Sequence, residues 1–221
     1  MAVNVRLAVS GAEFDFVYKD ECCPVKLKIT GEFNVYNALG ALGALISVGY
    51  SMRDAVDLLM LYQGTPGRFE TPDMHGAEYS VVIDYAHTPD GLENILKAVN
   101  GYKKGRIITV FGCGGNRDTA KRPIMGNIAA TYSDLCVITS DNPRYEEPNA
   151  IINQIASGMP EDYKSYVCIE NRFEAIKYAM QNATINDIIV IAGKGDEDYQ
   201  EIKGEKRHFS DREVVAEILQ K

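Results

Sequence analysis

The larger, C-terminal part of the chain repeats one pattern: a short apolar run, a polar loop, and a stretch with helical periodicity. The apolar runs are YSVVID, RIITVFG, LCVITS, SYVCI and DIIVIAG. Helices are expected at residues 88–99, 123–132, 149–157 and 171–183, and from Ser210 onward. A helix between two strands returns the chain to the starting edge of the sheet, so such strands run parallel. The pattern therefore predicts a mainly parallel sheet with helices on both faces.

The first 65 residues differ. Between residues 3 and 30, VNVRLAV, FDFVY and KLKIT alternate apolar and polar side chains, which predicts antiparallel strands with one wet face. Helices are expected over residues 35–48 and 51–61, the second opened by Ser51. QGTPG then breaks the chain, so we place a boundary between residues 1–65 and 66–221. The predicted fold class is α/β, a Rossmann-like sheet preceded by a β-hairpin and helical segment.

Charge and cysteine content exclude several classes of protein. The 31 acidic and 23 basic side chains give a formal charge of −8 with no basic block, which disfavours nucleic-acid binding. No apolar stretch approaches a membrane span, and the N-terminus does not resemble a secretion signal. The five cysteines form no CxxC pair and no cluster with the three histidines. We expect reduced thiols, a cytoplasmic protein, and no metal site.

Four expected strands end in unusual polar loops. They are DYAHTPDG (84–91), GCGGNRD (112–118), DNPR (141–144) and GKGDED (193–198). The carboxyl ends of parallel strands share one edge of the sheet, where open α/β sheets bind ligands. The sequence therefore predicts a binding site at this edge.

The chemistry of these loops fits an amino acid. Arg144 follows a proline that stiffens its turn, and a rigid guanidinium suits a carboxylate. Arg117 would receive an acidic group as well, and Glu197 would take an ammonium. Simpler interpretations remain open: Arg117 pairing with Asp118, and Lys194 and Glu197 as solvated loop charges.

Asp84 and His87, in the first of these loops, also have two interpretations. They could cap the helix that follows them. A carboxylate at a strand end could instead accept ribose hydroxyls or hold a metal-bound water. GKG is not a phosphate-binding loop, which requires G-x-x-x-x-G-K-[ST].

Seven segments in one order resemble the Mur ligase family. They are GEFNVYNALGA, TPGRFE, VIDYAHTPDGLENIL, VFGCGGNRDTAKRPIMG, TSDNPRYEEP, IAGKGDEDYQ and FSDREV. DNPR resembles the form found in members that add meso-2,6-diaminopimelate to UDP-N-acetylmuramoyl-L-Ala-D-Glu in peptidoglycan synthesis. Members that add lysine usually lack that arginine. The resemblance implies an ATP- and Mg²⁺-dependent amide ligase, with residues 1–65 as the tail of its central ATP-binding domain and 66–221 as its C-terminal, amino-acid-binding domain.

The resemblance also implies roles for individual residues. Those expected to contact the amino acid are Arg117, Asp141, Asn142, Arg144, Gly193 and Glu197. Those expected on the ATP side are Asn34 and Asn37 (adenine), Arg68 (phosphate), Asp84 and His87. Asp196 stands where the family usually has histidine; because Glu197 is retained beside it, we expect binding to persist.

The phosphate-binding loop and the magnesium-binding lysine of a complete ligase are missing from these 221 residues. We therefore expect this chain alone to be inactive, with no catalytic residue of its own, and to self-associate through the exposed residues 1–65. Its partners are expected to be small molecules. The alternatives are a non-catalytic ligand- or partner-binding module, or a relative that adds another amino acid such as lysine or builds folylpolyglutamate; DNPR with GKGDED argues against the latter group.

Overall fold

The computed structural model describes residues 1–8 and 10–220, and it divides into two compact units, residues 1–65 and 66–221. In the first unit, β1 (Ala2–Ala8), β2 (Gly11–Tyr18) and β3 (Glu21–Leu27) form an antiparallel sheet in the order β1-β2-β3. Alternate residues of β2 and β3, such as Phe14, Phe16 and Val25, are buried against two helices. This is the period of two expected of a half-buried sheet.

The two helices of the first unit are α1 (Glu32–Ser47) and α2 (Met52–Met60). Helix α2 begins as predicted, since the Ser51 hydroxyl accepts a hydrogen bond from the backbone N–H of Asp54. Helix α1 begins three residues earlier than the apolar periodicity suggested. Tyr36, Val48 and Leu61 are exposed, at 66%, 74% and 71% of their full area. The first unit therefore combines a closed core with a partly apolar surface.

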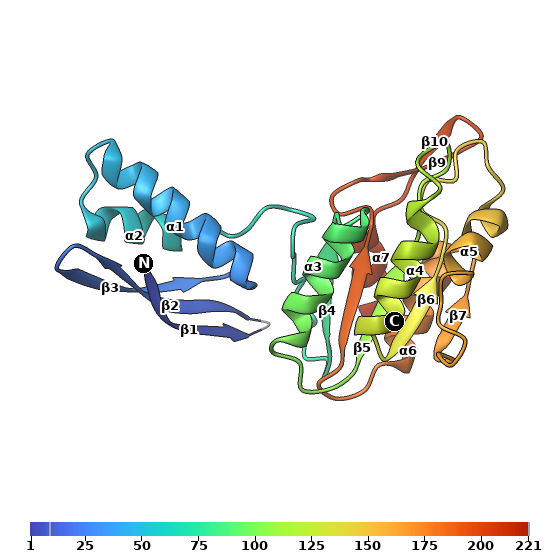
Figure 1. Cartoon of the computed structure of the whole chain (residues 1–221), viewed down its shortest axis with the longest axis horizontal. Helices are drawn as coiled ribbons and strands as arrows, with labels where there is room; N and C mark the ends of the chain where they lie inside the picture. Colours follow the sequence, from blue (N-terminus) through green and yellow to red (C-terminus); the bar gives the residue numbers. More distant parts are fainter. Residues whose placement is uncertain (9, 221) are drawn as a thin grey trace. The chain divides into compact units, whose positions relative to one another are not determined.

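The second unit is an α/β layer structure, which confirms the predicted fold class (Figure 1). Five parallel strands lie in the order β4-β8-β5-β6-β7. Their bounds are β4 (Ser80–Asp84), β5 (Ile107–Phe111), β6 (Leu135–Ile138), β7 (Tyr166–Cys168) and β8 (Ile188–Ala192). Every residue of β5 and β8 is buried. Central strands covered on both faces read as continuous apolar runs, which is how they appear in the sequence.

Helices cover both faces of this sheet. On one face lie α3 (Pro89–Asn100), α4 (Lys121–Tyr132) and α5 (Pro148–Ala156), packed in series. On the other lie α6 (Arg172–Asn182) and α7 (Asp211–Leu219). The hydroxyls of Thr88 and Ser210 and the amide oxygen of Asn171 cap three of these helices, as their positions predicted. Among the described residues, no helix has both the length and the apolar character needed to cross a bilayer.

A separate hairpin, β9 (Tyr199–Ile202) and β10 (Glu205–His208), follows the loop after β8. It was predicted as a short hairpin. Its first strand also meets the loop after β6, through a parallel bridge between Arg144 and Ile202. The hairpin therefore connects two loops at the carboxyl edge of the sheet.

Candidate functional site

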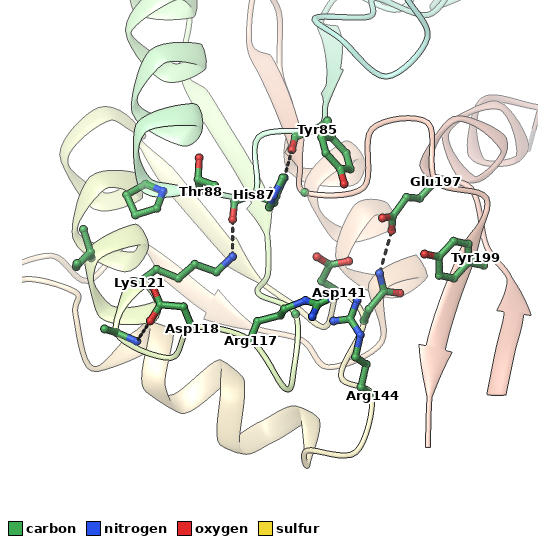
Figure 2. Close-up of a pocket in the computed structure, with 16 residues that line it drawn as sticks. Tyr85, His87, Thr88, Arg117, Asp118, Lys121, Asp141, Arg144, Glu197 and Tyr199 are labelled. Atoms are coloured by element: carbon green, nitrogen blue, oxygen red, sulfur yellow. Dashed lines mark hydrogen bonds between the residues drawn. The ribbon is translucent and has the colours of Figure 1, made fainter. Parts of the chain in front are cut away.

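A cavity of about 660 Å³ lies at the carboxyl edge of the five-stranded sheet. The loops after β4, β5, β6 and β8 all contribute to its wall, together with the start of α4 and Tyr199 of β9. Figure 2 shows the side chains of Arg117, Asp141 and Arg144 close together, with Glu197 beside them. The shared edge follows from the parallel strand order, so residues far apart in sequence converge there.

The predicted residues divide into three groups. Seven of them line this cavity: His87, Arg117, Asp141, Asn142, Arg144, Gly193 and Glu197. Asn34 and Asn37 belong to the first unit and line a smaller cavity of about 380 Å³ there. Arg68 and Asp84 lie in the second unit but outside the lining of the 660 Å³ cavity.

The carboxylate of Asp84 is hydrogen-bonded to the main chain around it. Its carboxylate accepts hydrogen bonds from the backbone N–H groups of Phe69 (2.7 Å) and Ala86 (2.8 Å). Burial raises the pKa of Asp84, and these bonds and the nearby Arg68 only partly oppose the rise. The guanidinium of Arg68 stacks over the ring of Tyr85, 4.6 Å from its centroid. Asp84 thus holds the first loop in shape, while the cap of α3 is Thr88.

His87 lies on the cavity wall beside Tyr85. Its Nδ1 is 2.8 Å from the carbonyl oxygen of Tyr85, and the two rings meet edge to face at 4.6 Å. Lys121, the first residue of α4, donates to the carbonyl oxygen of His87 at 2.6 Å. Lys121 lies two residues before the predicted helix 123–132, and nothing in that position indicated that it lines the same cavity as His87.

Lys194 is fully buried, so the interpretation of this residue as a solvated loop charge was wrong. Its ammonium donates to Asn142 Oδ1 (3.2 Å) and Glu197 Oε2 (3.3 Å) and lies 3.5 Å from Asp141 Oδ1. The amide of Asn142 also donates to Glu197 Oε2 at 2.9 Å. Removing a lysine from water is costly unless its charge is paired, and here two carboxylates surround it. Lys194 therefore holds the carboxylates of Asp141 and Glu197 in place through its buried ammonium group.

Arg144 has an unusual backbone for a non-glycine residue, with φ of 51°. Its N–H donates to the carbonyl of Glu201 (3.0 Å), and its carbonyl accepts from Lys203 (2.7 Å). In the side chain, Nε forms an ion pair with Glu201 at 3.2 Å, and Nη1 donates to the carbonyl of Gly115 at 3.0 Å. The turn at Arg144, which Pro143 was expected to stiffen, is therefore also held by contacts with β9.

A buried arginine joins the loops after β5 and β6. Arg122 is fully buried, and its two terminal nitrogens donate to the Glu146 carboxylate at 2.8 and 3.0 Å. Glu146 also accepts from the backbone N–H of Asn116 at 2.5 Å. The bonds from Arg122, and then that from Asn116, lower the pKa of Glu146. Sequence analysis did not single out Arg122, because its partner lies 24 residues away.

Two glycines allow these loops to touch. A β-carbon on Gly115 would lie 1.9 Å from the carbonyl oxygen of Pro143, and one on Gly112 would lie 2.3 Å from that of Thr139. No side chain fits at such distances, so only glycine permits this approach of main chain to main chain.

The balance of charge in the cavity suits a zwitterionic ligand with more than one charged end. Arg117, Lys121 and Arg144 are cationic, while Asp118, Asp141 and Glu197 are anionic. Arg117 is exposed and forms no ion pair within the described part of the chain, and its side chain extends toward Asp141 and Arg144 (Figure 2). Asp118 instead accepts from the backbone N–H of Ala120. The alternative pairing of Arg117 with Asp118 is therefore wrong. Such a wall can bind carboxylates and ammonium groups at separate points.

Comparison with known proteins assigns the family. The family described as "Mur ligase, glutamate ligase domain" matches residues 67–195, and the chain belongs to the Mur ligase family. That family comprises ATP-dependent ligases. Along its length the chain is similar to the C-terminal part of UDP-N-acetylmuramoyl-L-alanyl-D-glutamate–2,6-diaminopimelate ligases.

The individual similarities extend over nearly the whole chain. It is 48% identical over 219 residues to ligase 1 of this name from Clostridium acetobutylicum and 45% identical over 219 residues to the enzyme from Clostridium botulinum. In both cases 99% of this chain and 45% of the relative are covered. A solved structure of a ligase of the same name aligns with a TM-score of 0.76 at 36% identity, covering 99% of this chain and 45% of that one. The chain thus spans less than half the length of these relatives.

A more distant structure shares the fold. A pseudomurein peptide ligase type C from Methanothermus fervidus aligns with a TM-score of 0.70 at 23% identity, over 98% of this chain and 41% of that one.

Proposed function

We propose that this chain is the amino-acid-binding portion of an ATP-dependent amide ligase that adds meso-2,6-diaminopimelate to UDP-N-acetylmuramoyl-L-Ala-D-Glu in peptidoglycan synthesis. One observation carries the proposal: Arg144, held rigidly by its neighbours, lines a cavity that also presents Arg117, Asp141 and Glu197. The names of the similar ligases support the same substrate.

The amino acid would be held by opposite charges at its two ends. Diaminopimelate carries two carboxylates and two ammonium groups. Arg144 and Arg117 would receive carboxylates, and Glu197, Asp141 and Asn142 would receive an ammonium group, with Gly193 beside them. Lysine lacks the second carboxylate, so it would leave one guanidinium without a partner. A site built around a polar group rejects an analogue that lacks it.

The nucleotide contacts are a separate part of the proposal. Asn34 and Asn37 would contact adenine, Arg68 a phosphate, and Asp84 and His87 would lie on the ATP side. ATP and Mg²⁺ serve the family in activating a carboxylate for amide formation. The residues present do not by themselves form a phosphate-binding loop or an Mg²⁺ site: no G-x-x-x-x-G-K-[ST] occurs in the sequence, and the described residues contain no cluster of His, Cys, Asp or Glu suited to a metal ion. We therefore derive no activation step from this chain.

The proposal is tested by calorimetric titration of the chain with meso-diaminopimelate and with L-lysine. We expect saturable binding of diaminopimelate and at least tenfold weaker binding of lysine, since a charged hydrogen bond contributes about 1.5–3 kcal/mol. The chain alone should form no UDP-muramoyl tripeptide from ATP and the precursors. Equal binding of the two amino acids would contradict diaminopimelate as the proposed substrate. Tripeptide formation would contradict the proposal that this chain alone cannot complete the reaction.

The alternative for this portion is a binding module without catalysis. Adding the N-terminal portion of a ligase of this family separates the two. Amide formation in that mixture supports the ligase, whereas diaminopimelate binding without turnover supports the module.

A further inference from the structure

Glu201, on the β9–β10 hairpin, contacts two residues of the candidate amino-acid site without lining the cavity itself. Its carboxylate pairs with Nε of Arg144 at 3.2 Å. Its backbone N–H donates to Oδ1 of Asn142 at 2.9 Å, and its carbonyl accepts from the N–H of Arg144 at 3.0 Å. No other described residue holds both the main chain and the side chain of Arg144.

The contacts leave one part of the Arg144 guanidinium free. Nε is held by Glu201 and Nη1 by the carbonyl of Gly115, while Nη2 has no hydrogen-bond partner among residues 1–8 and 10–220. A guanidinium offers five N–H donors in a fixed plane. Fixing the Nε edge therefore determines where the outer, Nη edge points. Arg144 lines the cavity with a side chain that is 18% exposed, and Nη2 is the nitrogen left without a protein partner to meet a ligand there.

Glu201 also offsets the backbone cost of the turn. The left-handed region is unfavourable for a non-glycine residue. Two main-chain hydrogen bonds between Arg144 and the hairpin keep it there, one at 3.0 Å to Glu201 of β9 and one at 2.7 Å from Lys203 of the turn after β9. The hairpin thus sets the backbone of Arg144, and the Glu201 carboxylate sets its side chain.

We infer that Glu201 is a positioning residue that determines amino-acid specificity: it orients the Arg144 guanidinium so that the free edge meets the distal carboxylate of a diamino dicarboxylic acid. This inference rests on the proposed function. It assigns part of the discrimination between diaminopimelate and lysine to a residue that touches neither ligand.

Two substitutions separate the ion pair from the main-chain contacts of the hairpin. Glu201→Gln keeps the shape of the side chain and removes its charge, and Glu201→Leu removes every polar atom of the side chain while keeping the backbone contacts. Glu205→Leu is the matched control, because Glu205 lies on the same hairpin, its carboxylate forms an ion pair with Arg207 alone among the described residues, and its side chain is 72% exposed. The backbone amide NMR spectrum of each variant reports whether the hairpin is intact.

The first measurement needs no ligand. The Nε–H proton of Arg144, identified by its loss in Arg144→Lys, should exchange slowly with water in the parent and in Glu205→Leu, where the Glu201 carboxylate lies 3.2 Å from Nε. In Glu201→Leu it should exchange rapidly or vanish. An unchanged Nε–H signal in Glu201→Leu overturns the inference.

The second measurement is the ratio of dissociation constants for L-lysine and meso-diaminopimelate, obtained by titrating the complete chain. We expect Glu201→Leu to reduce the ratio about tenfold through weaker diaminopimelate binding, Glu201→Gln to reduce it by a smaller factor, and Glu205→Leu to retain it. If the parent prefers diaminopimelate and Glu201→Leu keeps the same ratio, the inference fails and the proposed function stands. If the parent shows no preference or binds neither amino acid, the proposed function fails and the inference with it.

Discussion

The guanidinium of Arg172 and the carboxylate of Asp211 form an ion pair with no exposure to solvent. Nε and Nη2 of Arg172 each donate to one oxygen of Asp211 at 2.8 Å, and Nη2 also donates to the carbonyl of Ala192 at 3.2 Å. The pair joins the first turns of α6 and α7 to the end of β8, where the loop containing Lys194 begins.

Asp211→Ala should lower the free energy of unfolding of the second unit by about 3–5 kcal/mol, because it leaves a buried guanidinium without its counter-charge. The control is Glu205→Ala, which removes an exposed partner of Arg207 and should cost less than about 1 kcal/mol. The measurement is urea unfolding followed by circular dichroism, since the chain has no tryptophan. Similar losses for the two variants would show that the buried pair adds little.

Asp187 should make the free energy of unfolding of the second unit depend on pH below about 4. Its side chain is 2% exposed, and burial alone would raise the pKa, but bonds from Arg106 and Thr184 outweigh burial and lower the pKa from 3.8 to about 2. The ionised form therefore stabilises the fold above its ordinary pKa, and this contribution is lost as the pH falls from about 4 through about 2. Between these values the unfolding free energy should fall less steeply in Asp187→Asn than in the parent. Equal slopes would refute this account.

Arg144→Ala should change selectivity rather than general activity. In a full-length ligase containing this portion, kcat/KM for diaminopimelate should fall about tenfold or more, because a charged hydrogen bond to the second carboxylate is lost. Arg144→Lys should lose a similar factor, since an ammonium cannot reproduce the planar fork. The value for lysine as substrate should hardly change in either variant. If both substrates lose the same factor, Arg144 only supports its loop.

Residues 66–221 should fold without residues 1–65, because the second unit has its own sheet and core. The isolated fragment should give the same amide NMR signals for β5 and β8 as the complete chain. Sedimentation of both species also tests the self-association expected of residues 1–65: the complete chain should be larger than a monomer and the fragment should not. A fragment that shows no dispersed signals would mean that the first unit is needed for folding.

Gly115→Ala and Gly43→Ala should change stability in opposite directions. A β-carbon at Gly115 would clash with Pro143, whereas one at Gly43, inside α1, meets no atom within 4 Å. Gly43→Ala should stabilise the first unit by about 0.5–1 kcal/mol, because alanine loses less backbone freedom in a helix. Gly115→Ala should destabilise the second unit and weaken diaminopimelate binding. The same unfolding and titration experiments measure both, and a neutral Gly115→Ala would show that the loops can separate at little cost.

The helices and strands could be predicted from the sequence better than the order of the strands and the contacts between distant side chains. Apolar runs separated by helical stretches indicated the parallel sheet, because buried strands and amphipathic helices differ in period. The strand order was not predictable, since no local signal places β8 between β4 and β5. The partners of the charged side chains were not predictable either. Lys194 is buried because it pairs with Asp141, 53 residues earlier, and the Asp84 carboxylate accepts a hydrogen bond from the main chain at Phe69. These outcomes depend on contacts formed only after the chain has folded.

The close approach of Gly112 to Thr139 and of Gly115 to Pro143 bears on how such a site could be redesigned. At these points the spacing of the loops is set by main-chain atoms, which every side-chain exchange elsewhere in the cavity leaves in place. Changing the preferred amino acid should therefore succeed through exchanges at cavity-facing positions such as 144 and 197, with the hairpin partner of Arg144 altered together with it. Lengthening or grafting only the loop after β5 or only the loop after β6 should fail, because the main chains of the two loops are in direct contact.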